Sequence, residues 1–278
     1  MSKILNIQGR LLALNRPQIM GIINATPDSF YTQSRQQTVL EALHIVEKMI
    51  QEGASIVDVG GMSTRPGAAL ISPDEEQTRI MPIISAIAQH FGEAIFISVD
   101  TIYGSTAKVA VEAGAGIIND ISAGQFDPNM LPMVAQLRAP YILMHTTDIP
   151  ARMQQKTDYP QGVVTTVFQF LAQKIQHLRQ LGIIDIVLDL GFGFGKTTEQ
   201  NFTLLHHLDS FAALGLPLLV GVSRKGMVWR TLQISPDEAL NGTTVLHTLA
   251  IQQGANILRV HDVAAARQVV ELMEVGRN

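Results

Sequence analysis

Short apolar runs that end in a polar residue recur about eight times along this chain, and a stretch with helical spacing follows each run. Strands that alternate with helices in this way imply a parallel sheet with right-handed crossovers. About eight such units favour closure of the sheet into a (β/α)₈ barrel, and an open doubly wound sheet is the alternative. The expected strands are 18–23, 55–59, 95–99, 116–119, 141–144, 186–189, 218–221 and 257–260.

The length and the helix signals agree with one α/β barrel. The chain has 278 residues, and a barrel of this type typically has about 250. No Pro/Ser-rich linker divides the chain, so we expect one domain over 1–278. The sequence SPDE at 72–75 and again at 235–238 is typical of a capped helix start. Helices are expected near 38–52, from 72 onward, 105–113, 129–137, 163–181, 199–209, 236–253 and 263–274, with a short strand or hairpin at 4–14.

Charge and composition exclude several classes of function. The net charge is −4, and no basic run is interleaved with aromatic residues, so we expect no nucleic-acid partner. The absence of cysteine excludes disulfides, thiolate catalysis and cysteine-ligated metals. The N-terminus lacks the pattern of a signal peptide, and no apolar run is long enough to span a bilayer. We therefore expect a cytoplasmic protein that has no membrane partner.

Polar residues at strand ends predict a binding site at one rim of the barrel. Asp100, Asn119 and Asp189 end three different strands. Carboxylates accept hydrogen bonds from N–H groups, and an asparagine both donates and accepts, so together they suit a neutral heterocycle. Asp58 lies inside its strand, and we assign it a structural role. The roles of two further residues at strand ends stay open, and these are Asp120 and His145.

The loop GGMSTRPG at 60–67 predicts an anion site. Its glycines allow backbone N–H groups to approach a ligand. Ser63, Thr64 and Arg65 add donors that suit a phosphate or a carboxylate. A tight turn with a surface arginine is the simpler alternative.

Charged residues after the last two strands extend this site. Lys225 could bind an anion, donate to a ring acceptor or form a Schiff base. Arg259 and His261 flank one residue of the last strand, so they share a face and suit a diphosphate. The side-chain oxygen of Asn24, at the end of the first strand, suits a hard cation.

The segment GFGFGKTT at 191–198 looks like a phosphate-binding loop but lacks its pattern. The G-x-x-x-x-G-K-[ST] motif needs a glycine at 190, where the chain has Leu190. We therefore expect no nucleotide here. The glycines instead let the backbone pass close to a bound ligand, and Phe194 is expected to cap the pocket.

Taken in order and spacing, the motifs of this chain resemble those of the dihydropteroate synthase family. The resemblance runs from about 18 to 263, and it is specific because the motifs occur together. They are NATPDSF (24–30), GGMSTRPGA (60–68), ISVDT (97–101), GIINDIS (116–122), LDLGFGFGK (188–196), LLVGVSRK (218–225) and LRVHDV (258–263).

The resemblance implies a barrel that joins 6-hydroxymethyl-7,8-dihydropterin diphosphate to 4-aminobenzoate, with Mg²⁺ as cofactor and a homodimer as assembly. Four residues would hold the pterin ring, namely Asp100, Asn119, Asp189 and Lys225. The diphosphate would lie against Arg259, His261 and, through Mg²⁺, Asn24. Thr64 would lie near the junction of the two substrates, and the aminobenzoate end would be formed by Arg65, Pro66 and Ser223, with Phe30 and Phe194 nearby. Asp189, Lys225, Arg259 and His261 would be the catalytic residues.

The chain departs from the family pattern chiefly after Phe30. The family usually has Ser-Asp-Gly-Gly there, and this chain has YTQS at 31–34. A pterin-binding paralogue with weak or no transfer activity is therefore the alternative function. A pterin methyltransferase domain and a Schiff-base aldolase that uses Lys225 are two further alternatives.

Overall fold

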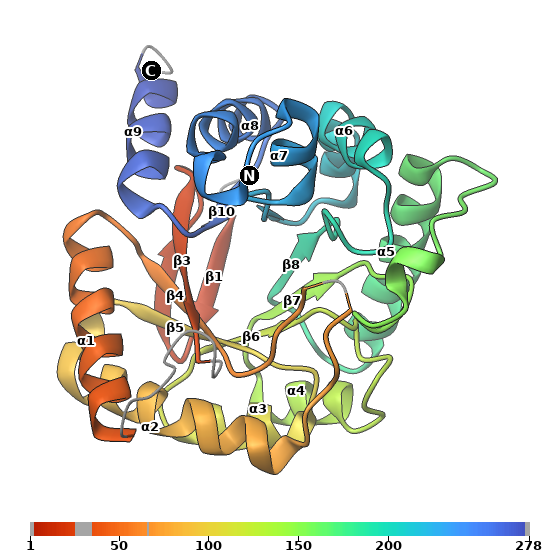
Figure 1. The fold of residues 1–278 in the computed structure, drawn as a ribbon. Helices are drawn as coiled ribbons and strands as arrows, with labels where there is room; N and C mark the ends of the chain where they lie inside the picture. Colours follow the sequence, from red (N-terminus) through yellow and green to blue (C-terminus); the bar gives the residue numbers. More distant parts are fainter. Residues whose placement is uncertain (1–2, 26–34, 66, 276–278) are drawn as a thin grey trace.

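Eight parallel strands close into a barrel in the part of the chain that the structure, a computed structural model, describes: residues 3–25, 35–65 and 67–275. The strand order is β10-β3-β4-β5-β6-β7-β8-β9, and Figure 1 shows the strands inside a ring of helices. This confirms the predicted barrel and excludes the open doubly wound sheet. The strands are β3 (Gln18–Asn24), β4 (Ile56–Gly60), β5 (Phe96–Asp100), β6 (Ile117–Asp120), β7 (Tyr141–Met144), β8 (Ile186–Asp189), β9 (Leu218–Val220) and β10 (Ile257–Val260).

Helices follow the strands and cover the outside of the barrel (Figure 1). Their α-helical parts are α1 (Arg35–Gln51), α2 (Pro73–Phe91), α3 (Gly104–Glu112), α4 (Met130–Leu137), α5 (Val163–Gln180), α6 (Thr198–His206), α7 (Gly226–Leu232), α8 (Leu240–Gln252) and α9 (Val263–Glu274). Short 3₁₀ turns occur at η2 (Gly92–Ala94), η3 (Met153–Gln155), η4 (Leu208–Leu214) and η5 (Pro236–Glu238).

Two details of the helices differ from the sequence prediction. The helix expected over 236–253 is divided, because the capping box of Ser235 and Glu238 starts a single 3₁₀ turn and α8 begins only at Leu240. Helix α7 was not predicted. It is short, and its N-cap Lys225 makes no side-chain capping bond, so it has no start signal in the sequence.

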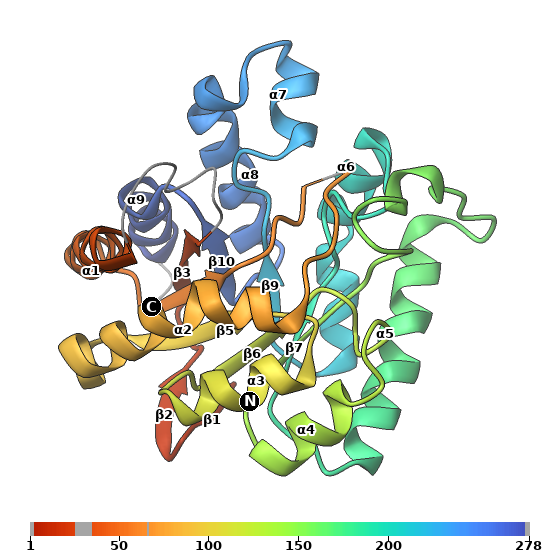
Figure 2. The same ribbon diagram turned by 60° about the horizontal axis from the view of Figure 1, so that its bottom comes forward.

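An N-terminal hairpin closes one end of the barrel. Strands β1 (Ile4–Ile7) and β2 (Arg10–Ala13) pair antiparallel, and Gln8 Nε2 donates to the carbonyl of Ala115 at 3.0 Å. Figure 2 shows the hairpin below the strands. Its apolar side chains share one cluster with the inward-facing residues at the strand starts: Leu5, Ile7, Leu12, Leu14, Met20, Ile56, Ile117, Ile142, Val187, Leu219 and Ile257. The hairpin thus covers the end where the strands start, and the strand ends lie at the opposite rim.

Alternation along each strand separates the core from the site. In β4, Val57 and Val59 belong to the main cluster between strands and helices, whereas Ile56 belongs to the inner cluster. Side chains two residues apart share a face, so Asp58 lies on the inner face with Ile56. Burying a valine or an isoleucine contributes about 1.5–3 kcal/mol. The fold is thus stabilised by the outer layer, and the inner face near the open rim is left for polar groups.

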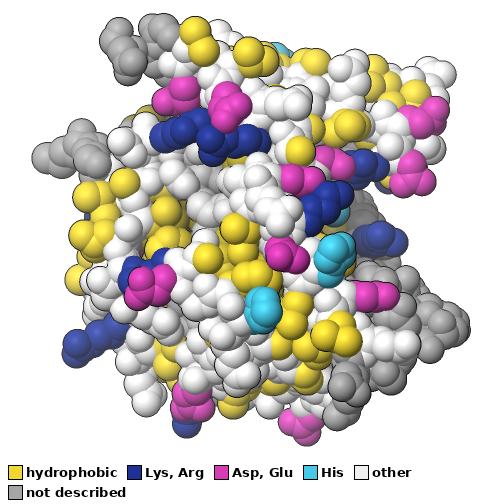
Figure 3. All heavy atoms as spheres, turned by 90° about the vertical axis from the view of Figure 1, so that its left-hand side faces the viewer, with side chains coloured by type: hydrophobic (Ala, Val, Ile, Leu, Met, Phe, Trp, Pro, Cys, Tyr) yellow, Lys and Arg dark blue, Asp and Glu magenta, His cyan; other side chains and the backbone are white. Residues whose placement is uncertain are grey.

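One face of the molecule carries side chains of both charge signs. On the side of α1 and α9, positive and negative side chains are interspersed (Figure 3). Among the helices that the structure describes, none is both long and apolar enough to cross a bilayer.

Candidate active site

Four strands of the barrel, β4, β5, β6 and β10, each bring one polar side chain into a single cluster. The cluster consists of Asp58, Asp100, Asn119 and Arg259. Arg259 donates from Nε to Asp58 Oδ2 at 2.7 Å and from Nη2 to Asp100 Oδ2 at 2.8 Å. Asn119 donates from Nδ2 to the same Asp58 oxygen at 2.9 Å. The side chains of Asp58, Asp100 and Asn119 are buried. The cluster thus forms the inner wall of a site at the open rim of the barrel.

One guanidinium in this cluster contacts two carboxyl groups. Burial raises the pKa of Asp100, and the neighbouring Asp58 raises it further, while Arg259 opposes the shift. Buried carboxyl oxygens of this kind suit a ligand that presents N–H donors.

Asp189 and Lys225 form the opposite part of the site. Asp189 is buried, and its Oδ1 accepts from the backbone N–H of Gly191 at 2.8 Å. Burial raises the pKa of Asp189, and the Lys225 ammonium counteracts this shift. Burial lowers the pKa of Lys225 to about 8, and Asp189 opposes that change. Lys225 Nζ lies 4.9 Å from the centre of the Phe194 ring and donates to the carbonyl of Phe192 at 2.6 Å.

Residues after β9 and β10 hold one another at the rim. Ser223 Oγ lies 3.1 Å from His261 Nδ1 and accepts from the His261 backbone N–H at 3.2 Å. The guanidinium of Arg224 binds both carboxylate oxygens of Asp262, each at 2.8 Å. His261 is exposed, so its ring can reach a ligand at the mouth of the barrel. The two strand ends therefore form one connected unit.

The remaining predicted residues lie further out. Thr64 is half-buried and Arg65 is exposed in the loop after β4, and Asn24 is exposed at the end of β3. Phe30, Pro66 and the altered segment 31–34 lie outside the described residues.

The structure revises the interpretation of several residues. Asp58 was assigned a structural role, and the structure shows that it lies inside the barrel and holds two predicted site residues, Asn119 and Arg259. The sequence signal for this position was its spacing from Gly60 at the end of the strand. Residues two apart in a strand share a face, so Asp58 and Gly60 both lie on the inner face of the barrel. Asp120 is structural, since it accepts from Ser122 N, Gly124 N and Tyr141 Oη.

Lys196 is a further residue that sequence reasoning missed. In a phosphate-binding loop a lysine at this position would reach a phosphate. Here the side chain is buried, and Nζ donates to the carbonyls of Gly191 and Phe194, each at 2.9 Å. It also lies 3.0 Å from His145 Nδ1, which accounts for the unassigned histidine. This geometry agrees with the expectation that the segment is not a nucleotide site.

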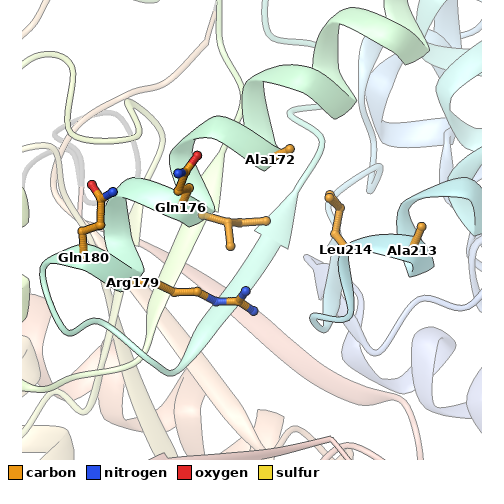
Figure 4. A pocket seen from close by; sticks show the side chains of 7 residues that line it. Ala172, Gln176, Arg179, Gln180, Ala213 and Leu214 are labelled. Atoms are coloured by element: carbon orange, nitrogen blue, oxygen red, sulfur yellow. The ribbon is translucent and has the colours of Figure 1, made fainter.

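A surface pocket of about 530 Å³ lies between α5 and η4 (Figure 4). It is lined by the C-terminal half of α5, which precedes the start of β8 in the chain, so it is near the closed end of the barrel. It does not include the strand-end residues. The lining residues are Ala172, Ile175, Gln176, Arg179, Gln180, Ala213 and Leu214.

Comparison with known proteins gives the class to which this barrel and its buried polar site belong. The family described as pterin binding enzyme matches residues 20–261. A dihydropteroate synthase from a Synechocystis strain is 43% identical over 262 residues, which are 93% of this chain and 90% of that protein.

Solved structures give the same result. The structure of Xanthomonas albilineans dihydropteroate synthase with 4-aminobenzoic acid has a TM-score of 0.89 and 39% identity, and the match covers 99% of this chain and 98% of that one. The same enzyme in complex with 7,8-dihydropteroate has a TM-score of 0.86 and 38% identity, with 98% of each chain covered. This chain therefore belongs to the dihydropteroate synthase family. The relatives do not support the alternative of a paralogue without transfer activity.

Proposed function

We propose that the chain condenses 6-hydroxymethyl-7,8-dihydropterin diphosphate with 4-aminobenzoate to give 7,8-dihydropteroate and pyrophosphate, a step of folate biosynthesis. This is the transferase activity of its family. The observation that carries the proposal is the buried cluster of Asp58, Asp100, Asn119 and Arg259, which faces Asp189 and Lys225 across one site. Relatives crystallised with 4-aminobenzoic acid and with 7,8-dihydropteroate support the two substrate classes.

The first role of the site is recognition of the pterin ring. The ring presents an amino group, N–H donors and ring acceptors. Asp100 and Asp189 would accept from the donors, and Asn119 would both donate and accept. Lys225 lies beside Asp189. Its Nζ would donate to a ring acceptor while Asp189 accepts from a ring donor. Burial of these groups makes a missing partner costly, which favours the pterin over ligands that lack its donors.

The second role is stabilisation of the departing diphosphate. The bond between the pterin methylene carbon and the diphosphate oxygen breaks, and the electron pair stays with that oxygen. Arg259 and His261 would hold the resulting pyrophosphate. A guanidinium has five N–H donors, and two of the Arg259 nitrogens contact carboxylates, so donors remain for an anion. The carboxylate of Asp189 would stabilise the positive charge that develops on the pterin.

The third role is reception of the arylamine. The neutral nitrogen of 4-aminobenzoate attacks the methylene carbon, a C–N bond forms, and one proton passes from that nitrogen to the released pyrophosphate or to water. An arylamine is uncharged at neutral pH, so no strong general base is required. Arg65, being exposed, suits the carboxylate of the incoming substrate. Thr64, Ser223 and the ring of Phe194 would complete this end of the site.

The residues also fit Mg²⁺ as the cofactor. In the described part of the chain, no group of three or more His, Asp or Glu side chains could form a metal site. Mg²⁺ commonly keeps several waters and binds substrate phosphates with only one or two protein oxygens. The exposed amide oxygen of Asn24 at the rim suits this role. When bound, Mg²⁺ would supply positive charge that stabilises the leaving diphosphate.

A homodimer in the cytoplasm is the expected assembly and location. Exposed apolar side chains on and next to α7 and α8 support a partner surface there, namely Leu232, Leu240 and Val245. Sedimentation of the purified chain tests the dimer. A species with the 30.3 kDa mass of one chain at all concentrations would contradict it.

The activity is tested by pyrophosphate release with both substrates, with Mg²⁺ and with a chelator. Release that needs both substrates and falls on chelation is expected. Tight binding of the pterin diphosphate without release would support the paralogue instead.

The aldolase alternative is tested by borohydride reduction, after which an adduct on Lys225 would contradict the synthase mechanism.

A further inference from the structure

The loop between β8 and α6 is shaped by side chains from outside it. We call residues 191–195 the pocket loop. Each of its five consecutive carbonyl oxygens accepts a hydrogen bond from a side chain. The donors, in order, are Lys196 Nζ to residue 191 (2.9 Å), Lys225 Nζ to 192 (2.6 Å), Gln154 Nε2 to 193 (2.6 Å), Lys196 Nζ to 194 (2.9 Å) and Tyr159 Oη to 195 (2.8 Å). A segment without regular secondary structure thus has a defined shape, because its backbone acceptors are paired.

The pocket loop also packs tightly against the segment that follows β7. Gly191 has φ +69°, and a Cβ there would lie 1.9 Å from the carbonyl oxygen of His145. Gly195 has φ +62°, and a Cβ there would lie 1.9 Å from Thr147 Oγ1. Two separate loops at the rim are therefore held against each other.

Lys196 lies at the centre of this contact. Its side chain is 3% exposed, and it makes two of the five hydrogen bonds to the pocket loop. The same Nζ lies 3.0 Å from His145 Nδ1 and 3.4 Å from the His145 carbonyl. Lys196 Nζ thus connects the pocket-loop carbonyls at 191 and 194 to the end of β7.

The environment of His145 suits an acceptor rather than a catalyst. Its ring is buried and packs edge-on against Phe170, with 4.9 Å between ring centres. Burial holds the pKa of His145 far below its usual value, and Lys196 lowers it further, so the ring is neutral and Nδ1 can accept. Burial also lowers the pKa of Lys196 to about 7, which Asp189 opposes.

We propose that Lys196 and His145 form a positioning pair that sets the shape of the pocket loop, and through it the places of Lys225 and Phe194 in the substrate site. The inference rests on the proposed function, since it assigns these two residues to the same reaction. Lys225 donates to the loop carbonyl at 192, and the Phe194 ring belongs to the loop itself. A shift of the loop therefore moves both groups.

The positioning role predicts unequal effects on the two substrates. Asp100 and Asn119 are held by Arg259 and Asp58 rather than by the pocket loop, so this half of the pterin wall is unaffected. The other half contacts the loop, through Asp189 to Gly191 and through Lys225 to Phe192. Phe194 lies at the aminobenzoate end. We expect Lys196→Met to raise the KM for 4-aminobenzoate about tenfold and to lower kcat by a similar factor, because the buried hydrogen bonds of Nζ to two loop carbonyls are lost. The KM for the pterin diphosphate should change less than about threefold.

The experiment compares Lys196→Met with Lys174→Met under full steady-state kinetics. Lys174 is half-buried and also caps a loop, since Nζ donates to the carbonyl of Ala123 at 2.9 Å, but that loop follows β6. The control should keep both KM values and kcat. A merely structural role for Lys196 would reduce the folded fraction and leave both KM values unchanged, and that result would overturn the proposal.

A second pair of variants keeps the test decisive if Lys196→Met does not fold. His145→Asn retains a polar acceptor close to the position of Nδ1, and His145→Leu removes it. The asparagine variant should keep the KM for 4-aminobenzoate near that of the original chain, and the leucine variant should raise it. Equal KM values for 4-aminobenzoate in the two variants would overturn the proposed positioning pair. If the unmodified chain releases no pyrophosphate, the proposed function fails instead, so the two failures are distinct.

Discussion

Asp58 Oδ2 accepts from Arg259 Nε at 2.7 Å, although the two residues are 201 positions apart in the sequence. The carboxylate is fully buried and also accepts from Asn119, so it positions two of the residues assigned to substrate. The barrel creates this contact because its closure brings β4 and β10 to the same interior, on either side of β3.

Replacement of Asp58 should weaken both folding and binding. Asp58→Asn removes the buried negative charge beside Arg259, and we expect the free energy of unfolding to fall by about 1–3 kcal/mol. Urea denaturation measures it. Asp209→Asn removes an equal charge from an exposed position and should change stability by less than about 0.5 kcal/mol. Equal stability of both variants would show that the Asp58 contact contributes nothing.

Asp189→Asn should separate catalysis from folding. The amide keeps an oxygen that can accept from Gly191 N, a bond of 2.8 Å in the structure, so the fold should persist. The loss of the negative charge should reduce kcat by about 10²–10³, the usual effect of removing a group that stabilises developing charge. Pyrophosphate release and the thermal midpoint are the measurements. Near-normal turnover would refute stabilisation of the pterin cation by Asp189.

A pair of glycine variants tests the packing of the pocket loop. Gly191 and Gly182 have φ values of +69° and +81°, but only a Cβ at 191 meets another atom, the His145 carbonyl oxygen at 1.9 Å. Gly182→Ala should cost about 1 kcal/mol from backbone strain alone. Gly191→Ala adds a steric clash, so it should cost at least about 2 kcal/mol more. Thermal unfolding compares the two, and similar costs would argue against the close contact.

His247 should make the fold sensitive to acid. The residue is 2% exposed, and neither ring nitrogen has a hydrogen-bond partner among the described residues. Burial lowers the pKa of His247 to about 4 from 6.5, which Asp262 opposes. The unfolded chain therefore binds a proton at a pH where the folded chain does not. Stability should be full above about pH 6.5 and fall as the pH decreases toward 4.

His247→Leu is the corresponding variant. It should reduce the loss of stability between pH 7 and pH 4 by up to about 3 kcal/mol, the equivalent of the pKa shift. It should also leave pyrophosphate release at neutral pH unchanged. Denaturation at several pH values provides the measurement, with His44→Leu at an exposed position as control. Parallel pH profiles for the two variants would contradict the assignment.

Some site residues could be recognised from the sequence, and others could not. Asp100, Asn119 and Asp189 were recognisable because each ends an apolar run, and the structure places all three at one rim. The contacts of Lys196 could not be predicted, because its sequence context resembles a phosphate-binding loop and nothing local indicates that the side chain turns toward backbone carbonyls.

The sequence by itself determined the order of the strands, the order of the helices other than α7, and the kind of residue at each strand end. It could do so because hydrophobic periodicity and helix capping are local properties. Tertiary structure decided which of these residues meet. The contact of Arg259 with Asp58 and that of Lys196 with His145 each join separate strands or loops, and the closure of the barrel brings them together. Such contacts depend on the packing of the whole chain, so no local pattern specifies them.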